Sequence, residues 1–406
     1  MTEYDAIVVG GGPAGSTAAK IIAEAGFRVL IIERAGPGRN KACAGGISIR
    51  AFEKLNLDYK DFVEREIFGA RICSPDNSII EHDYRRTVGI TVYREKFDSY
   101  LLRSAMNTGC DVLTNAMARD FSRTNASAEV LFEKNNTTER ISGKIIIAAD
   151  GAFSNISRKA GLNGYDKNDV GVCAQYEMEM KEEDINALIG NKIELYFGDS
   201  IAPGGYGWIF PKKRGVTVGV GIPLPDKKKK MSEYLETFVE KHPIASQKLK
   251  NAKIIGRTGG SVPIKGVRGN TYSDNLLVVG DAAGQVSPLT AEGIYYSMIS
   301  AKIAARTAMD AISENDFSKK YLEKYEHEWK KEIGADLKWG ILINKLMLSE
   351  DRKINYLVHE AGYDRNLKIM IADFIMGAAP YDEILWNYYK TVLPFFFKGF
   401  VKGIYF

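Results

Sequence analysis

The stretch YDAIVVGGGPAGSTAAKIIAEAGFRVLIIER, residues 4–34, predicts a strand, a tight turn, a helix and a second strand in succession. Residues 5–9 form a buried apolar run, and residues 27–32 form another. Between them, residues 14–25 are strong helix formers that end at Gly26, a residue suited to a helix C-cap. This order is typical of the first unit of an α/β nucleotide-binding fold.

Three glycines in the turn, Gly10, Gly12 and Gly15, follow the G-x-G-x-x-G pattern. Gly10 permits the turn, Gly12 lets a pyrophosphate approach the backbone, and Gly15 lets the helix pack close to the strand. The unpaired N–H groups at the start of the helix then face the phosphates. Glu33, at the end of the second strand, can accept hydrogen bonds from a ribose hydroxyl. Because the strand, helix and acid are in register, the sequence predicts a dinucleotide site.

Length and charge narrow the class of protein further. The chain has 406 residues, enough for a large core and two closely joined domains, and its net charge of +4 argues against a dedicated nucleic-acid binder. Its four cysteines and four histidines are scattered, so we expect no disulfide framework and no metal site. We also expect no secretory signal and no membrane-spanning segment, which fits a cytoplasmic protein.

Two later segments favour FAD over NAD as the dinucleotide. KIIIAADGAFSNISRKAGL, residues 144–162, and NLLVVGDAAGQVSPLTAEGIYYSMISAKIAA, residues 275–305, each read as a buried strand, a Gly/Asp turn and a helix. They resemble the flavoprotein family that includes aromatic hydroxylases of the glutathione-reductase-like FAD fold. The resemblance implies that Asp281 meets the ribityl chain and that Gly293 and Ile294 lie near the isoalloxazine ring. A carboxylate suits a polyol, and a helix N-terminus stabilises the negative charge of reduced flavin.

A further segment, VYREKFDSYLLRSAMNTGCDVLTNAMARDF at residues 92–121, resembles the same family. The resemblance implies that Arg94 lies along FAD and that the Ala118 region closes over the adenine side. A surface arginine on an amphipathic helix and an ordinary strand are the alternatives. Because no second complete G-x-G-x-x-G is followed by an acid, we expect no nicotinamide domain. Electrons would then come from an external donor that visits transiently, such as reduced nicotinamide, ferredoxin or another carrier.

An aromatic motif, YFGDSIAPGGYGWIFPK at residues 196–212, bears on the substrate. The region predicts sheet, with Tyr206, Trp208 and Phe210 alternating onto one face of a strand, and core packing alone could account for such a row. YFG followed by PGGYGWIFP closely resembles the signature of the geranylgeranyl reductase family. The resemblance implies that the three rings line a tunnel for an isoprenoid chain, while the glycines shape the tunnel.

The segment KACAGGIS, residues 41–48, resembles the Cys-x-Gly-Gly segment of the same family. The resemblance implies that its backbone touches the flavin and that Cys43 lies close by, although a small buried hydrophobe is an alternative reading of Cys43. Cys43 and Tyr206 are the candidate proton donors, with water as a third, and our hypothesis is that Cys43 contributes. The candidate cofactor residues are Gly10, Gly12, Ala14, Gly15, Glu33, Arg34, Ala44, Gly45, Ile47, Arg94, Ala118, Asp281, Gly293 and Ile294.

The family resemblance implies an FAD-dependent reductase that saturates isolated C=C bonds of geranylgeranyl chains, above all those of the digeranylgeranylglycerophospholipids of archaeal membranes. Reduced FAD would supply a hydride from N5, and a second group would supply a proton. One alternative is a flavin monooxygenase or halogenase of the same fold. A prenyl-binding carrier without enzyme activity is another, although intact Glu33 and Asp281 argue against it.

We predict an α/β protein in which an antiparallel-sheet, α+β substrate domain is inserted into a Rossmann-like FAD-binding domain, with a C-terminal helical cap. The last segment, DEILWNYYKTVLPFFFKGFVKGIYF at residues 382–406, is aromatic and cationic. It suits either an interfacial segment at the inner face of the cell membrane or a final core helix. The predicted divisions are 1–60, 90–165 and 255–310 for FAD, 60–90 and 165–255 for substrate, and 311–406 for the helical region.

Overall fold

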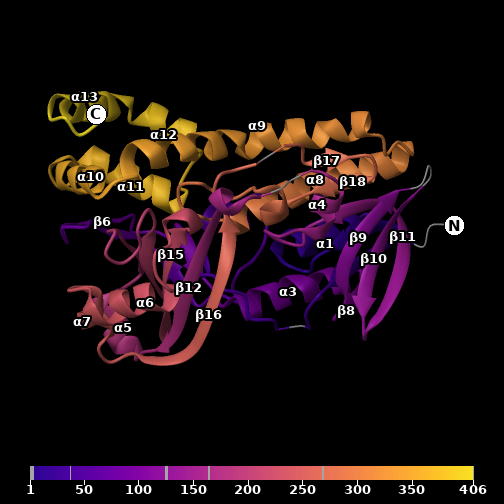
Figure 1. Cartoon of the computed structure of the whole chain (residues 1–406), viewed down its shortest axis with the longest axis horizontal. Coiled ribbons are helices and arrows are strands. Elements are labelled where there is room, and N and C mark those ends of the chain that lie inside the picture. Colours follow the sequence, from indigo (N-terminus) through magenta and orange to yellow (C-terminus); the bar gives the residue numbers. More distant parts are fainter. Residues whose placement is uncertain (1–3, 37, 124–126, 163–164, 268, 406) are drawn as a thin grey trace.

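The chain forms two large β-sheets side by side, with its C-terminal helices running along one edge of both (Figure 1). This computed structural model describes residues 4–36, 38–123, 127–162, 165–267 and 269–405. The mixture of parallel and antiparallel sheets with many helices agrees with the predicted fold class.

The first sheet has eight strands, and its centre, β1 (Tyr4–Val9), pairs in parallel with strands on both sides. Alternate side chains of β1 therefore enter two different cores. Ala6 and Val8 pack against helices, whereas Ile7 and Val9 face the β9–β10 hairpin. The other strands are β2 (Val29–Glu33), β8 (Asp111–Thr114), β9 (Met117–Arg123), β10 (Ala128–Lys134), β11 (Thr137–Ala148), β17 (Tyr272–Ser273) and β18 (Leu276–Val278).

Three helices cover the first face of this sheet: α1 (Pro13–Glu24), α3 (Arg94–Asn107) and α8 (Ile294–Glu314). The strand–turn–helix–strand prediction is confirmed, with small shifts at the ends. Helix α1 ends at Glu24, and Gly26 follows with a φ of +89°. Strand β2 begins two residues later than expected, because the N–H of Phe27 still bonds the Ile22 carbonyl at the helix end.

The second sheet has seven strands and is antiparallel except where β13 pairs in parallel with β5. One face packs on the short helices α5 (Glu182–Leu188), α6 (Met231–Glu236) and α7 (Ala245–Leu249). The other face packs against C-terminal helices. Its strands are β5 (Gly69–Cys73), β6 (Ile79–Asp83), β12 (Val170–Glu179), β13 (Lys192–Tyr196), β14 (Tyr206–Pro211), β15 (Gly215–Pro223) and β16 (Lys253–Pro263).

Two features of this part depart from the predicted boundaries. Strand β16 joins the second sheet, although the sequence grouped residues 255–263 with the FAD-binding segments. In addition, β3 (Gly46–Ser48), β7 (Gly89–Thr91) and β4 (Arg65–Ile67) form a separate three-stranded sheet. The division into functional domains itself stays a prediction.

The C-terminal part is helical: most of its first helix, α9 (Lys319–Ile343), packs on the core of the first sheet, and the later helices lie over the second sheet (Figure 1). Tyr356 stacks on Phe395, and its hydroxyl donates to the Phe395 carbonyl, which ties α13 to α10. No helix in the described ranges is both long and apolar enough to cross a membrane. The helices are α9 (Lys319–Ile343), α10 (Asp351–Tyr363), α11 (Arg365–Met376), α12 (Tyr381–Asn387) and α13 (Tyr389–Val401).

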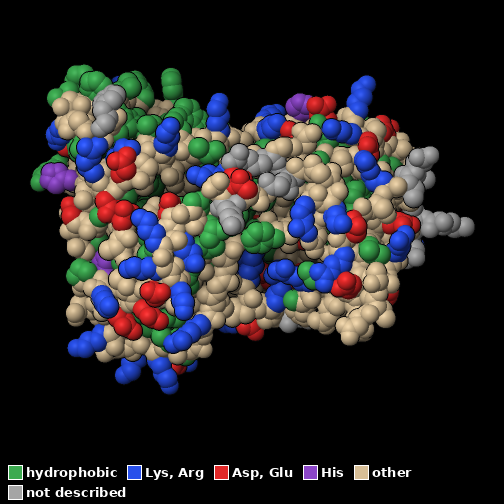
Figure 2. All heavy atoms as spheres, viewed as in Figure 1, with side chains coloured by type: hydrophobic (Ala, Val, Ile, Leu, Met, Phe, Trp, Pro, Cys, Tyr) green, Lys and Arg blue, Asp and Glu red, His purple; other side chains and the backbone are tan. Residues whose placement is uncertain are grey.

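The last helices, which include most of residues 382–406, have both an inner and an outer apolar face. Phe395 is buried in the core beneath α13. The opposite face carries large exposed side chains at helical spacing, and Figure 2 shows apolar side chains gathered over the end of the molecule where α13 lies. These exposed residues are Trp386, Tyr389, Leu393, Phe397, Phe400 and Val401.

Candidate active site

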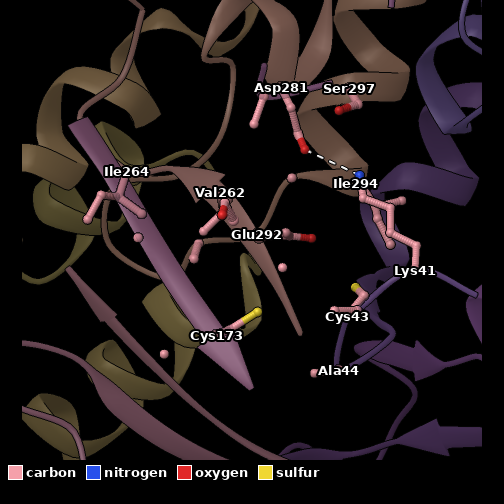
Figure 3. Close-up of a pocket in the computed structure, with 18 of the residues that line it drawn as sticks. Lys41, Cys43, Ala44, Cys173, Val262, Ile264, Asp281, Glu292, Ile294 and Ser297 are labelled. Carbon is pink, nitrogen blue, oxygen red and sulfur yellow. Dashed lines mark hydrogen bonds and ion pairs between the residues drawn. The ribbon is translucent and has the colours of Figure 1, made fainter. Parts of the chain in front are cut away.

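A cavity of about 1000 Å³ opens between the two sheets. Its walls run from the glycine turn after β1, through residues 41–48, to the aromatic strand β14 and the ends of α9 and α11. Figure 3 shows side chains from residues 41–44, from β12 and the end of β16, and from residues 281–297 around this space. The cavity brings together the predicted nucleotide, flavin and substrate residues, whose roles stay predictions.

The nucleotide end of the cavity fits a dinucleotide. Gly10 has a φ of +104°, and a Cβ built on Gly15 would lie 1.8 Å from the Gly10 carbonyl oxygen. Helix α1 begins after Gly12 with no side-chain cap, so its first N–H groups face the cavity. A Cβ built on Gly12 would lie 3.0 Å from the end of the Arg39 side chain.

Glu33 is held at the edge of this turn. Its Oε2 accepts from the Gly11 N–H at 2.6 Å and its Oε1 from the Ala35 N–H at 2.9 Å. The buried carboxylate lines the cavity, where it can also meet a ribose hydroxyl. Ala14, Arg34 and Ala118 also line this end.

Arg94 is buried rather than on the surface, which excludes the surface reading of this residue. Its guanidinium donates to both carboxylate oxygens of Asp98, at 2.8 and 2.9 Å, and it also interacts with the Cys43 side chain. Across the cavity, Lys41 Nζ lies 3.4 Å from Asp281 Oδ2 (Figure 3). Gly293 and Ile294 follow at the start of α8 and line the same space.

The loop at residues 41–46 forms one wall of the cavity. Gly45 has a φ of +76°, and a Cβ there would lie 2.0 Å from the Val92 carbonyl oxygen. Lys212, fully buried at the end of β14, donates from Nζ to the Ala44 carbonyl oxygen at 2.6 Å. Burial lowers the pKa of Lys212 to about 8, although the negative charge of Glu177 opposes the shift. Lys212 was missed in the sequence because a lysine after a proline reads as a solvated strand end.

The aromatic row lines the cavity as a group, since Tyr206, Trp208 and Phe210 all belong to its wall. The Tyr206 hydroxyl donates to the Thr290 carbonyl oxygen at 2.5 Å, which joins β14 to the turn before α8. The Trp208 indole lies over Gly219 on the neighbouring strand, where a Cβ would meet the ring at 2.2 Å. Glycines therefore make room for the rings.

The far end of the cavity is apolar and reaches the C-terminal helices. Leu195, Phe197 and Leu289 line both the main cavity and a smaller one of about 40 Å³. The smaller cavity is lined mainly by apolar side chains, among them Leu357 of α10 and Phe374 of α11. A long apolar chain suits such walls better than a polar substrate does.

Glu292 is a second residue that the sequence analysis missed. It lies in the turn immediately before Gly293, with its carboxylate in the cavity (Figure 3). One signal in the sequence could have pointed to Glu292. It lies between Asp281 and Gly293, two residues that the family resemblance assigns to FAD. Elsewhere in the described ranges, no group of three or more His, Cys, Asp or Glu side chains could hold a metal ion.

Fold and site together define a flavoprotein. Residues 3–335 match the model of the FAD binding domain family, so the chain belongs to that family and its cofactor is FAD. The residues at the glycine turn and cavity fit this cofactor, as described above. The chain is therefore a flavin-dependent oxidoreductase.

The particular family follows from a relative in Methanocaldococcus jannaschii named digeranylgeranylglycerophospholipid reductase. The two are 36% identical over 397 residues, covering 96% of this chain and 98% of that protein. A relative in Methanothermobacter thermautotrophicus, named digeranylgeranylglycerophospholipid reductase 2, is 36% identical over 355 residues. The match covers 85% of this chain and 88% of that protein. The chain belongs to the digeranylgeranylglycerophospholipid reductase family.

Solved structures show the same fold. A geranylgeranyl bacteriochlorophyll reductase-like protein from Thermoplasma acidophilum is 29% identical, with a TM-score of 0.80, covering 95% of this chain and 98% of that one. The flavin-dependent halogenase CmlS is similar in fold alone, at 18% identity and a TM-score of 0.69, covering 91% of this chain and 72% of that one.

Proposed function

We propose that this protein is an FAD-dependent reductase that saturates the isolated C=C bonds of geranylgeranyl chains carried by digeranylgeranylglycerophospholipids. The observation that carries the proposal is the continuous cavity, which has a nucleotide-binding turn at one end and an aromatic and aliphatic lining at the other. The names of the relatives support the same substrate class.

The residues that line each part of the cavity suggest which of them would hold FAD and which would hold the substrate. The glycine turn, Glu33 and Asp281 would hold FAD, and the backbone of residues 44–47 would lie beside the ring. Reduced FAD, when bound, supplies the two electrons as a hydride. The rings of Tyr206, Trp208 and Phe210 would hold the alkene in place and keep water out. An external electron donor would reduce the flavin between turnovers.

The deciding experiment is anaerobic reoxidation of the flavin. We would reduce the purified yellow protein with dithionite, add a geranylgeranyl phospholipid, and follow the flavin absorbance together with the mass of the lipid. We expect reoxidation with a gain of two hydrogens per double bond. A flavin that stays reduced beside an unchanged lipid would overturn the proposal, and oxygen consumption on later addition would favour the monooxygenase or halogenase alternative. A colourless protein that binds prenyl chains would favour the carrier.

The exposed face of α12 and α13 would rest on the surface of a membrane that contains anionic lipids. The outward apolar residues are accompanied by Lys390, Lys398 and Lys402, and this arrangement suits an interfacial helix. Lys398 and Lys402 share Glu360 as a partner, which leaves the pair with a net positive charge. In this reading the protein works in the cytoplasm, peripherally on the inner face of the cell membrane.

This surface predicts a measurable change in vesicle binding. Replacing both Leu393 and Phe397 by Glu should lower co-sedimentation with anionic phospholipid vesicles by about tenfold or more, since each apolar side chain contributes about 1.5–3 kcal/mol on burial. Ile255→Glu, on an exposed position of β16 away from these helices, is the matched control and should bind normally. Equal binding by all three proteins would contradict the proposed surface.

A further inference from the structure

Glu292 is placed by a tight turn between the Gly280–Ala283 segment and α8. The Ser287 N–H donates to the Glu292 carbonyl oxygen, and the Ala291 N–H donates to the Ser287 carbonyl oxygen, both at 2.9 Å. These bonds fix the backbone on both sides of the turn. The side chain then enters the cavity that also contains Cys43 and Ile294 (Figure 3).

The carboxylate makes few contacts with the protein. Among the described residues, its one hydrogen bond is from the Ser48 N–H to Oε1, at 3.3 Å. Its Oε2 lies near the Gly377 backbone, 3.4 Å from a Cβ built there. A carboxyl in this state has one oxygen free for exchange of a proton with a ligand in the cavity.

The charges around Glu292 leave it poorly neutralised. Arg50 of α2 (Ile49–Leu55) is a cation that faces it, but this guanidinium also lies 3.8 Å from Asp336 and donates to the Tyr295 hydroxyl at 3.0 Å. Asp336 itself opposes a negative charge at Glu292. Burial, as the largest cause, raises the pKa of Glu292 to about 7. The titratable and charged groups that face it are Arg50, Asp336, Tyr206, Tyr295, Tyr296 and Tyr381.

Tyr206, one of the two candidate proton donors named from the sequence, is less suited to this task. Its proton is already donated to the Thr290 carbonyl oxygen at 2.5 Å, and burial raises its pKa further above the ordinary value. Cys43 Sγ accepts from the Gly45 N–H at 3.3 Å, an interaction that holds the loop. A general acid works best when its pKa lies near the operating pH. Burial brings the pKa of Glu292 closer to neutral than that of an ordinary carboxyl.

We propose that Glu292 is the proton donor of the reaction and gives its proton to the alkene carbon that does not receive the hydride. This inference rests on the proposed function. The O–H bond of the carboxyl breaks and a C–H bond forms, while the two electrons that reduce the C=C bond come from the reduced flavin. The carboxylate left behind regains its proton from water before the next double bond is reduced.

The test uses the FAD-loaded full chain. Glu292→Gln keeps the size of the side chain but removes the acid, so anaerobic reoxidation by the geranylgeranyl phospholipid should slow by about 100-fold or more. In the wild type the rate should fall as pH rises above about 7, because only the protonated carboxyl can deliver a proton. The variant should lose this dependence. Glu332→Gln, at a part-exposed partner of Lys54, is the matched control and should react like the wild type.

A readout independent of activity is the infrared band of a protonated carboxyl, which should disappear on titration through about pH 7 in the wild type and be absent in Glu292→Gln. FAD content and the unfolding midpoint check that the variant folds. If it does not retain FAD, Glu292→Asp replaces it, and that variant should react more slowly while keeping a fall in rate with pH.

Three results would overturn the inference. One is a wild-type rate in Glu292→Gln. Another is loss of the pH dependence in Cys43→Ser together with its retention in Glu292→Gln, which would assign the proton to Cys43. The third is a wild-type protein that itself does not reduce the lipid, which removes the proposed function and this inference with it. The flavin reoxidation measured with the wild-type protein distinguishes this last result from the other two.

Discussion

Gly15→Ala should yield a protein that no longer retains FAD. A Cβ at this position would lie 1.8 Å from the Gly10 carbonyl oxygen and 3.1 Å from a methyl carbon of Val8. Because the first contact is backbone, α1 would have to move away from β1, and the N–H groups at the start of the helix would move with it. We expect FAD affinity to fall by about 100-fold or more, with a loss of unfolding free energy of about 3 kcal/mol.

The measurements are flavin absorbance per protein after gel filtration, flavin fluorescence on titration, and denaturant unfolding. Gly362→Ala is the control, since it lies in helix α10 with no atom within 4 Å of a new Cβ. That change should leave FAD content unchanged and stabilise the fold by up to about 1 kcal/mol. A fully yellow Gly15→Ala protein would show that the turn does not hold the dinucleotide.

Gly219→Ala should impair lipid reduction while leaving FAD bound. The added methyl group would meet the Trp208 ring at 2.2 Å and the Ala174 carbonyl oxygen at 2.8 Å, so the indole must leave its place over β15. Because Trp208 forms part of the cavity wall, we expect the rate of lipid-dependent flavin reoxidation to fall by about tenfold. Overpacking at a strand contact should also lower the unfolding free energy by about 1–3 kcal/mol.

Gly256→Ala on β16 is the matched change in the same sheet, because its nearest neighbour, Glu177, lies at an ordinary contact distance of 3.5 Å. We expect that variant to reduce the lipid at the wild-type rate. An unaffected rate in Gly219→Ala would mean that the position of Trp208 does not matter to the alkene. If the same variant loses FAD, the lower rate would instead be explained by the missing cofactor.

The local parts of the fold could be predicted because their signals lie close together in the sequence. The β1–α1–β2 unit follows from apolar runs and three glycines, and Tyr206, Trp208 and Phe210 follow from strand alternation. The position of β16 could not be predicted in this way. Its pairing with β12 joins segments about 80 residues apart, and no local pattern specifies such a partner.

The two site residues that the sequence analysis missed were missed for the same reason. Lys212 and Glu292 are charged side chains whose meaning depends on burial, and burial is decided by segments distant in sequence. A lysine is ordinarily exposed, so Lys212 reads as a strand end. Its role becomes visible only in the folded chain. There residues 41–46 lie close to Lys212, and its Nζ donates to the Ala44 carbonyl oxygen beside the cavity.

The two apolar surfaces of the C-terminal helices have a consequence for how the substrate is supplied. Helix α11 lines the far end of the main cavity, and α10 and α11 together line the smaller cavity beside it. Helix α13, packed on α10, turns its other face outward. Moving a C20 chain through water would cost on the order of 10 kcal/mol or more, at about 0.8 kcal/mol per methylene. If the protein rests on a membrane as proposed, a chain that enters from the bilayer beside these helices would avoid that barrier. The enzyme would then respond to the surface density of the lipid rather than to its concentration in solution, and dilution into added vesicles should slow it.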